Sequence, residues 1–101
     1  MVQVVRSATF DRWLGKLKDQ RAAARVLVRI NRLAAGNPGD VKPVGQGVSE
    51  MRINYGPGYR IYYLTHDDRV VLLLTGGDKS TQETDIRKAH DIAAEWKRNR
   101  P

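Results

Sequence analysis

Residues 48–63 read V-S-E-M-R-I-N-Y-G-P-G-Y-R-I-Y-Y, and this stretch decides the fold. Apolar or aromatic residues alternate with more polar residues up to Gly56–Gly58, and the alternation resumes after this turn. Two segments with a period of two residues around a Gly-Pro-Gly turn are typical of a β-hairpin. Because successive residues of a strand point to opposite sides, the side chains of such a hairpin divide between two faces. The rest of the chain is placed around this hairpin.

The apolar pattern also predicts the register of the hairpin. A three-residue loop at Gly56–Gly58 sets Tyr55 opposite Tyr59 and Ile53 opposite Ile61. A two-residue loop would slip the register by one residue and move a whole set of side chains to the wrong face, so the longer loop is favoured. One face is then largely apolar, with Met51, Ile53, Tyr55, Tyr59, Ile61 and Tyr63. The other face, which we expect to be open, carries Glu50, Arg52, Asn54, Arg60 and Tyr62.

The composition bounds the class of protein. The chain has 101 residues, which is enough for one domain with one core. A net charge of +7 favours a polyanionic partner (nucleic acid, an acidic protein or a membrane surface) over an inert basic surface. The absence of cysteine excludes thiol chemistry, and the two histidines lack the spacing of a metal site, so we expect no metal and no cofactor. No signal peptide is recognisable and Val70–Leu74, the longest apolar run, is too short to cross a bilayer, so we expect a cytoplasmic protein.

The segments before the hairpin predict one strand and two helices. Met1–Arg6 is rich in valine and predicts a strand. Ser7 or Thr9 can cap a first helix, and Asp19 can cap a second that runs to about Ala35. The buried stripe expected for the first helix is Phe10, Trp13, Leu14 and Leu17.

The second helix is predicted to have an apolar and a basic side. The apolar side gathers Ala23, Val26, Leu27, Ile30, Leu33 and Ala34. Roughly opposite lies a basic stripe at helical spacing, made of Arg21, Arg25, Arg29 and Arg32. Such a stripe is either a solvated helix face or a contact for a polyanion such as RNA, and the sequence leaves both interpretations open.

The segments after the hairpin predict a further strand and a last helix. Arg69–Thr75 is nearly continuously apolar, which is typical of a strand that is central or covered on both faces. Ser80 and Glu83 match a capping box, so a helix is expected to begin there. Its expected buried stripe is Ile86, Ala89, Ile92, Ala93 and Trp96, and its basic tail is Lys97, Arg98 and Arg100. With Asn37–Gly47 as an irregular connection, the order is β-α-α-β-β-β-α, an α+β fold in one domain over residues 1–101.

Residues 76–80 read G-G-D-K-S, which invites comparison with a phosphate-binding loop. The motif fails, because Asp78 stands where that loop needs a glycine. Lys79 remains a candidate anion contact, since it lies where the last helix is expected to begin. The alternative is that the two glycines only turn the chain and that Lys79 is simply exposed.

Four blocks follow one another along the chain in a specific order. They are F-D-R-W-L-x-K-L-K-D, R-I-N-R-L-A-x-G-N-P-G-D, V-S-E-M-R-I-x-Y-G-P-G-Y-R-I-Y-Y and L-L-L-T-G-G-D-K-S-T-Q-x-x-D-I-x-K-A. Together they resemble the RelE/ParE toxin superfamily, and more narrowly its HigB-like branch of addiction module killer proteins. The resemblance runs from about Val2 to Trp96.

The resemblance implies a small RelE-like fold, a twisted and mainly antiparallel sheet with two N-terminal helices packed on one face. It implies the toxin of a type II toxin–antitoxin module that acts as a ribosome-dependent, metal-independent mRNA endonuclease and inhibits translation. The implied partners are the ribosome, mRNA and a cognate antitoxin, expected to be a helix-turn-helix DNA-binding protein from the neighbouring gene. The alternatives are a ParE-like poison of DNA gyrase and a non-catalytic basic module that binds nucleic acid or protein.

The resemblance also implies site residues, namely Arg52 and Arg60 on the basic sheet surface and Lys79 in a G-D-K element. RNA cleavage by its own 2′-OH needs in-line geometry, a proton acceptor and cations on the developing phosphorane. Arginine forks suit phosphate oxygens, and Lys79 would stabilise the leaving side. The candidate proton acceptors, in falling order, are Glu50, Tyr62 and His90. Glu50 could instead orient an arginine through a salt bridge, and neither histidine lies in the hairpin as it does in some HigB active sites. The basic stripe of Arg21, Arg25, Arg29 and Arg32 would bind RNA, the ribosome or the antitoxin.

Overall fold

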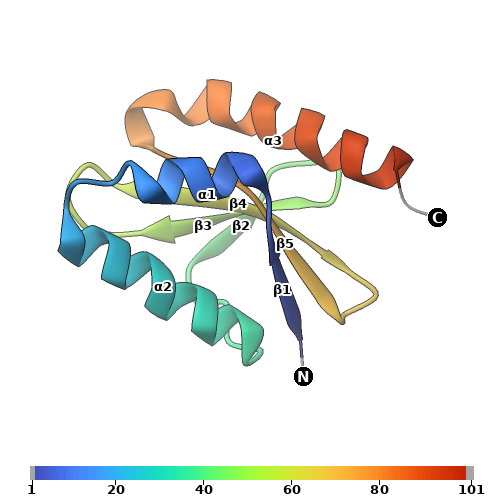
Figure 1. The fold of residues 1–101 in the computed structure, drawn as a ribbon, viewed down its shortest axis with the longest axis horizontal. Coiled ribbons are helices and arrows are strands. Elements are labelled where there is room, and N and C mark those ends of the chain that lie inside the picture. Colours follow the sequence, from blue (N-terminus) through green and yellow to red (C-terminus); the bar gives the residue numbers. More distant parts are fainter. Residues whose placement is uncertain (1, 100–101) are drawn as a thin grey trace.

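A five-stranded sheet forms the centre of the protein in the computed structural model, which describes residues 2–99 (Figure 1). The strands are β1 (Gln3–Arg6), β2 (Val41–Pro43), β3 (Val48–Ile53), β4 (Tyr59–His66) and β5 (Val70–Asp78). Their order in the sheet is β1-β5-β4-β3-β2. β1 pairs with β5 in parallel, and the other three pairs are antiparallel. The predicted mainly antiparallel sheet is confirmed, and the short strand β2 is an addition within the segment expected to be an irregular connection.

Helices cover both faces of the sheet. α1 (Ala8–Gly15) and α2 (Gln20–Ala34) lie on one face, whereas α3 (Gln82–Arg98) lies on the other, after a 3-10 turn at Lys79–Thr81 (Figure 1). The core under α1 and α2 includes Phe10, Val26, Ile30, Met51, Ile61 and Leu73. The core under α3 includes Tyr62, Leu64, Leu72, Leu74, Ala89 and Ala93. The predicted packing of two N-terminal helices on one face is therefore confirmed.

The register of the central hairpin differs from the predicted one by two residues. Ile53 pairs with Tyr59 and Met51 pairs with Ile61, so residues 54–58 form the loop. Within this loop Gly56 and Gly58 have positive φ angles of 56° and 79°, a conformation that glycine adopts without strain. A shift of two residues keeps every side chain on its predicted face, because the side-chain period of a strand is two. The apolar pattern could therefore predict the faces of the hairpin but not its pairing.

The face expected to be open is in fact covered by α3 along most of its length. Glu50 and Tyr62 are both 0% exposed, and Ala89 and Ala93 of α3 pack into the same cluster as Tyr62. The alternation of the strands shows which residues share a face but not which helix covers that face. The end of the hairpin that carries Arg52 and Arg60 remains partly accessible.

The helix caps agree with the sequence at two of three positions. The Ser7 side chain accepts a hydrogen bond from the backbone N–H of Phe10, and Asp19 caps α2 in the same way. The predicted capping box of Ser80 and Glu83 is wrong, because Asp78 caps the intervening 3-10 turn instead. The first turn of α3 thus begins without a side-chain cap.

The phase of α2 also differs slightly from the prediction. The buried row consists of Ala22, Val26, Ile30 and Leu33. Leu27 was placed on the apolar side but is 42% exposed, since it lies beside this row rather than in it. Met1 of the predicted first strand and Arg100 of the predicted basic tail lie outside the described residues. Within residues 2–99, no helix is long and apolar enough to cross a membrane.

Candidate functional site

Two arginines lie side by side at the loop end of the hairpin. Arg52 of β3 pairs directly with Arg60 of β4, so both side chains leave the sheet on the same face as Glu50 and Tyr62. The side chain of Arg52 is 34% exposed and that of Arg60 is 14% exposed. The pairing of the strands therefore concentrates two positive charges where the cover of α3 ends.

Glu50 is the buried counter-ion of these arginines. Its Oε1 accepts a hydrogen bond from Nε of Arg52 at 3.2 Å and lies 3.8 Å from Nε of Arg60. Its Oε2 accepts hydrogen bonds from the hydroxyl of Tyr62 at 2.9 Å and from Nε2 of Gln82 at 2.8 Å. Both carboxylate oxygens are thus engaged by donors from β3, β4 and α3. The geometry matches the salt-bridge alternative for Glu50.

The protonation states of this network follow from its contacts. Burial alone would raise the pKa of Glu50, but hydrogen bonds from Gln82, Tyr62 and Arg52 and the charge of Arg60 outweigh it and lower the pKa. Burial and the hydrogen bond to the Glu50 carboxylate raise the pKa of Tyr62 far above its ordinary value. At neutral pH Glu50 is therefore a weakly basic anion and Tyr62 is a neutral donor, so neither is well suited to accept a proton.

A cavity of about 360 Å³ opens beside the two arginines, and we call it the arginine pocket. Its lining includes Asp40, Arg52, Asn54, Arg60, Lys79 and the loop Gly56–Gly58. The structure thus brings three of the predicted site cations to one cavity, although they come from three separate elements. The Nε–H of Arg60 is buried and has no hydrogen-bond acceptor among the described residues. A buried charged donor without an acceptor is costly, which marks this position as one that suits an anionic ligand.

Lys79 reaches the arginine pocket because of how β5 ends. Gly76 and Gly77 are buried residues of β5 and do not form the turn considered in the sequence. A Cβ at Gly76 would meet the Trp13 ring at 2.4 Å, and one at Gly77 would meet the Asp85 carboxylate at 1.8 Å, so both positions require glycine for packing. Lys79 follows in the 3-10 turn, where its Cβ lies 3.6 Å from a Cβ built on Gly58. The tip of the hairpin therefore faces Lys79.

His90 lies apart from this group. Its Nε2 is 2.9 Å from the carbonyl oxygen of Val44, in the connection between β2 and β3, and His90 does not line the arginine pocket. The structure therefore does not bring this candidate proton acceptor together with Arg52, Arg60 and Lys79.

Three residues near the site were not singled out as site residues from the sequence. Gln82 belongs to the block G-G-D-K-S-T-Q that carries part of the family resemblance, and this block was the sequence signal near it. Asn54 was placed on the correct face by the alternation but without a role, and it lines the pocket from the hairpin loop. Asp40 comes from the connection before β2, and no sequence pattern indicated that it would lie there.

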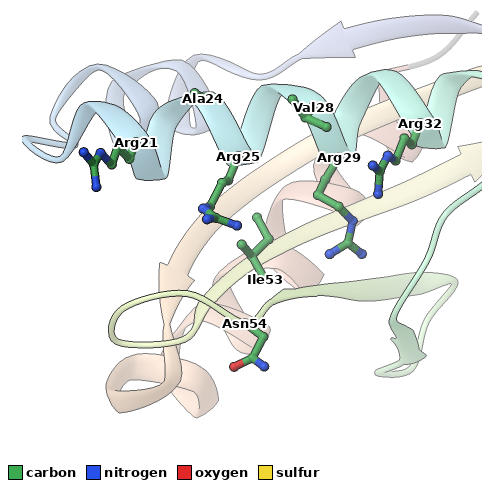
Figure 2. A pocket seen from close by; sticks show the side chains of 8 residues that line it. All are labelled: Arg21, Ala24, Arg25, Val28, Arg29, Arg32, Ile53 and Asn54. Carbon is green, nitrogen blue, oxygen red and sulfur yellow. The ribbon is translucent and has the colours of Figure 1, made fainter.

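A second cavity, of about 600 Å³, follows α2 and is lined by all four arginines of the basic stripe (Figure 2). Arg29 differs from the rest, because its guanidinium donates hydrogen bonds to the carbonyl oxygens of Arg52 at 2.6 Å and Pro38 at 3.0 Å. It is therefore half-buried and ties α2 to the loop end of β3, whereas the stripe was expected to be free of such packing. Arg25 stacks over the ring of Tyr55 at 4.5 Å.

The architecture is that of a RelE-like α+β protein, and known structures agree. One chain of the toxin–antitoxin complex RelBE2 from Mycobacterium tuberculosis superposes with a TM-score of 0.62 and 25% identity, over 77% of this chain and 98% of that chain. The solution structure of a conserved hypothetical protein from Helicobacter pylori matches with a TM-score of 0.54 and 22% identity, over 79% and 97% of the two chains. The second match shows the fold alone.

Residues 12–97 match the family described as phage derived protein Gp49-like (DUF891), and the chain belongs to this family. An uncharacterized protein from Haemophilus influenzae is 49% identical over 94 residues, which are 93% of this chain and 95% of that protein. The likeness to the RelBE2 chain thus supports the RelE-like toxin superfamily that the sequence resembles, which is a broader group than its HigB-like branch.

Proposed function

We propose that this protein is the toxin of a type II toxin–antitoxin module and that it cleaves messenger RNA on the ribosome, as an endoribonuclease that inhibits translation. The observation that carries the proposal is the arginine pocket, which Arg52, Arg60 and Lys79 all line and in which the buried Nε–H of Arg60 has no hydrogen-bond acceptor among the described residues. The RelE-like fold supports the same function. The HigB-like branch is the narrower kinship that we propose within this superfamily.

In the proposed reaction the 2′-OH of the substrate attacks the adjacent phosphorus, and the bond from phosphorus to the 5′ oxygen breaks. The products are a 2′,3′-cyclic phosphate and a 5′-hydroxyl, and the proton lost by the 2′-OH is balanced by one gained by the leaving oxygen. Arg52 and Arg60 bind the phosphate oxygens and stabilise the phosphorane, and Lys79 stabilises the leaving oxygen. Each positioned cation of this kind contributes about 3–4 kcal/mol to transition-state stabilisation. No metal ion enters the scheme.

Glu50 acts in this scheme as a positioning residue rather than as the principal base. It holds the Arg52 side chain and stays ionised, because Tyr62 and Gln82 donate to its second oxygen. His90 has no part in the scheme, since it lies against Val44. Catalysis by this chain is therefore mainly electrostatic, and the ribosome would supply much of the orientation of the substrate.

The proposed partners are a cognate antitoxin, the ribosome and mRNA, all in the cytoplasm. The antitoxin is supported by the toxin–antitoxin complex among the structural neighbours, and we expect it to be a helix-turn-helix DNA-binding protein from the neighbouring gene. The net charge of +7 suits an association with polyanions.

Induction of the protein in a bacterium, followed by mapping of messenger ends and a supercoiling assay, tests the proposed function. We expect new cleavage ends inside translated coding regions and unchanged supercoiling. Altered supercoiling without new messenger ends would instead show a gyrase poison. A protein with neither effect would be a non-catalytic basic module.

A further inference from the structure

The cavity along α2, which we call the α2 groove, has a strongly one-sided charge. Figure 2 shows the side chains of Arg21, Arg25, Arg29 and Arg32 leaving α2 on the same side, above Ile53 and Asn54. Among the described residues that line this groove, none is an aspartate or a glutamate. Arg29 is fixed by backbone carbonyls, which are neutral acceptors, so its charge still contributes to the groove. An occupant of the α2 groove must therefore be anionic.

The α2 groove also has an apolar component. Val28 lines it and is 48% exposed, and Leu27 beside it on α2 is 42% exposed. Ala24 and Ile53 complete the apolar part of the lining. Exposed aliphatic side chains between charged ones are typical of protein–protein contacts, in which an apolar anchor is surrounded by a polar rim.

The same surface is poorly suited to single-stranded RNA. Binding of single strands relies on aromatic side chains on which the bases stack. The aromatic residue next to the α2 groove is Tyr55, but the guanidinium of Arg25 lies over its ring and its hydroxyl donates to Asp19. The exposed anchor is thus aliphatic, and the ring of Tyr55 is already engaged.

We propose that the α2 groove binds an acidic, amphipathic segment of a partner protein. Carboxylates of the segment pair with Arg21, Arg25 and Arg32, and an aliphatic side chain packs on Val28. Assignment of this segment to the antitoxin rests on the proposed function, whereas the binding chemistry does not depend on cleavage. The α2 groove and the arginine pocket share Asn54, so the bound segment lies next to the arginine pocket.

Binding of synthetic peptides to the full-length protein tests the proposal directly. The probe is a helical peptide with Glu and Leu at i, i+4 spacings, and its reference is a peptide with the same charges in which Ser replaces each Leu. A single-stranded oligoribonucleotide serves as the third probe. Amide NMR shifts locate each binding site, and fluorescence anisotropy gives each Kd. We expect the Glu/Leu peptide to shift the amides of Val28 and Ile53 and to bind at least about tenfold more tightly than the Glu/Ser peptide.

Matched variants separate the α2 groove from general charge effects. A double variant that carries Arg21→Glu and Arg25→Glu should bind the Glu/Leu peptide more weakly by more than about tenfold. Arg87→Glu with Lys88→Glu makes the same change in net charge on exposed positions of α3 and should leave the Kd within about twofold. Val28→Ser should reduce the preference for Leu over Ser in the peptide. If the first double variant fails to fold, Arg21→Gln with Arg25→Gln replaces it.

Three outcomes would overturn the proposal. Equal affinity for the two peptides would show that charge alone drives binding. Shifts outside the α2 groove would place the site elsewhere. An oligoribonucleotide that shifts the α2 groove amides while the peptide does not would identify a nucleic-acid surface. None of these readouts depends on cleavage, so failure here leaves the proposed function standing, and loss of that function leaves the peptide result unchanged.

Discussion

Arg60 and Ile61 are consecutive residues of β4 whose side chains lie on opposite faces of the sheet. Arg60 reaches the arginine pocket, whereas Ile61 is 0% exposed under α1 and α2. Arg60→Ala should reduce messenger cleavage by at least about a hundredfold, because it removes a cation from the phosphorane. It should lower the free energy of unfolding by no more than about 1.5 kcal/mol, because Glu50 loses only an ion pair at 3.8 Å and keeps its hydrogen bonds from Arg52, Tyr62 and Gln82.

Ile61→Ala is the matched control and should lower the free energy of unfolding by about 2–5 kcal/mol through the cavity it leaves. Thermal melts and an in vivo messenger-cleavage assay on both variants separate the two cases. A folded Arg60→Ala protein that cleaves at the normal rate would remove Arg60 from the site.

Glu50 gives the protein an acid-sensitive site. Its pKa is lower in the folded chain than the ordinary value of 4.5, because its hydrogen bonds and the charge of Arg60 outweigh the effect of burial. The ionised form therefore stabilises the fold fully above the unfolded pKa, and this stabilisation is lost as the pH falls through the folded pKa. Glu50→Gln should flatten the dependence of unfolding free energy on pH below about pH 4.5.

Tyr62→Phe removes one donor to the Glu50 carboxylate. The slope of its unfolding free energy against pH should lie between the slopes of the wild type and of Glu50→Gln. Urea unfolding at a series of acidic pH values measures all three slopes. Identical slopes for the wild type and Glu50→Gln would show that the network does not hold Glu50 ionised.

At the scale of elements, the end of β5 depends on two glycines that accommodate side chains from helices. A Cβ at Gly77 would lie 1.8 Å from Oδ2 of Asp85, which is itself buried and accepts a hydrogen bond from Thr81. Gly77→Ala should therefore displace the start of α3 and destabilise the protein by roughly 1–3 kcal/mol.

Gly15→Ala is the matched control, because nothing lies within 4 Å of a Cβ built at that residue of α1. It should stabilise the protein by about 0.5–1 kcal/mol. Chemical denaturation of the two variants gives both values, and a neutral Gly77→Ala would contradict the close packing of Asp85 against β5.

The elements show which parts of the fold could be predicted from sequence. The hydrophobic period fixed the faces of β3 and β4, and Ser7 and Asp19 cap α1 and α2 as predicted. The pairing of the hairpin was not predictable, because registers two residues apart keep the same faces. The strand β2 was missed, since Val41–Pro43 is short and lies between glycines. The burial of Glu50 under α3 depends on a long-range contact that no local pattern encodes.

The candidate site was predictable to a similar extent. The resemblance singled out Arg52, Arg60 and Lys79, and the structure places all three around the arginine pocket. The hydrogen bond from Gln82 to Glu50 joins residues far apart in sequence and could not be read from spacing. His90 was a candidate only as one of two histidines, and its contact with Val44 depends on how α3 packs. The catalytic roles of all these residues stay predictions.

At the scale of the whole molecule, two cationic surfaces of different construction adjoin at Asn54. The arginine pocket is the smaller one and contains a buried Nε–H that lacks a hydrogen-bond acceptor among the described residues, as expected for a phosphate site. The α2 groove is larger and combines four arginines with an exposed valine, as expected for a protein segment. Arg29 connects them, because it lines the α2 groove and donates to the carbonyl oxygen of Arg52. Part of the excess of basic residues thus lies on two surfaces that we expect to take different partners.

Because the two surfaces are distinct, we expect variants of one to lose messenger cleavage and variants of the other to lose antitoxin binding. The test is co-production of the protein with the product of the neighbouring gene, the expected antitoxin. Wild-type toxicity should be suppressed, and the two proteins should purify together. Arg21→Glu with Arg25→Glu should still cleave messengers but should escape suppression, because the carboxylates of the antitoxin segment lose their partners. Arg60→Ala should lose cleavage yet still purify with the antitoxin. The control, Arg87→Glu with Lys88→Glu, should behave as the wild type in both assays. If the variant with Arg21→Glu and Arg25→Glu loses cleavage but binds the antitoxin normally, Arg21 and Arg25 would instead lie against the ribosome, one of the contacts considered for the basic stripe.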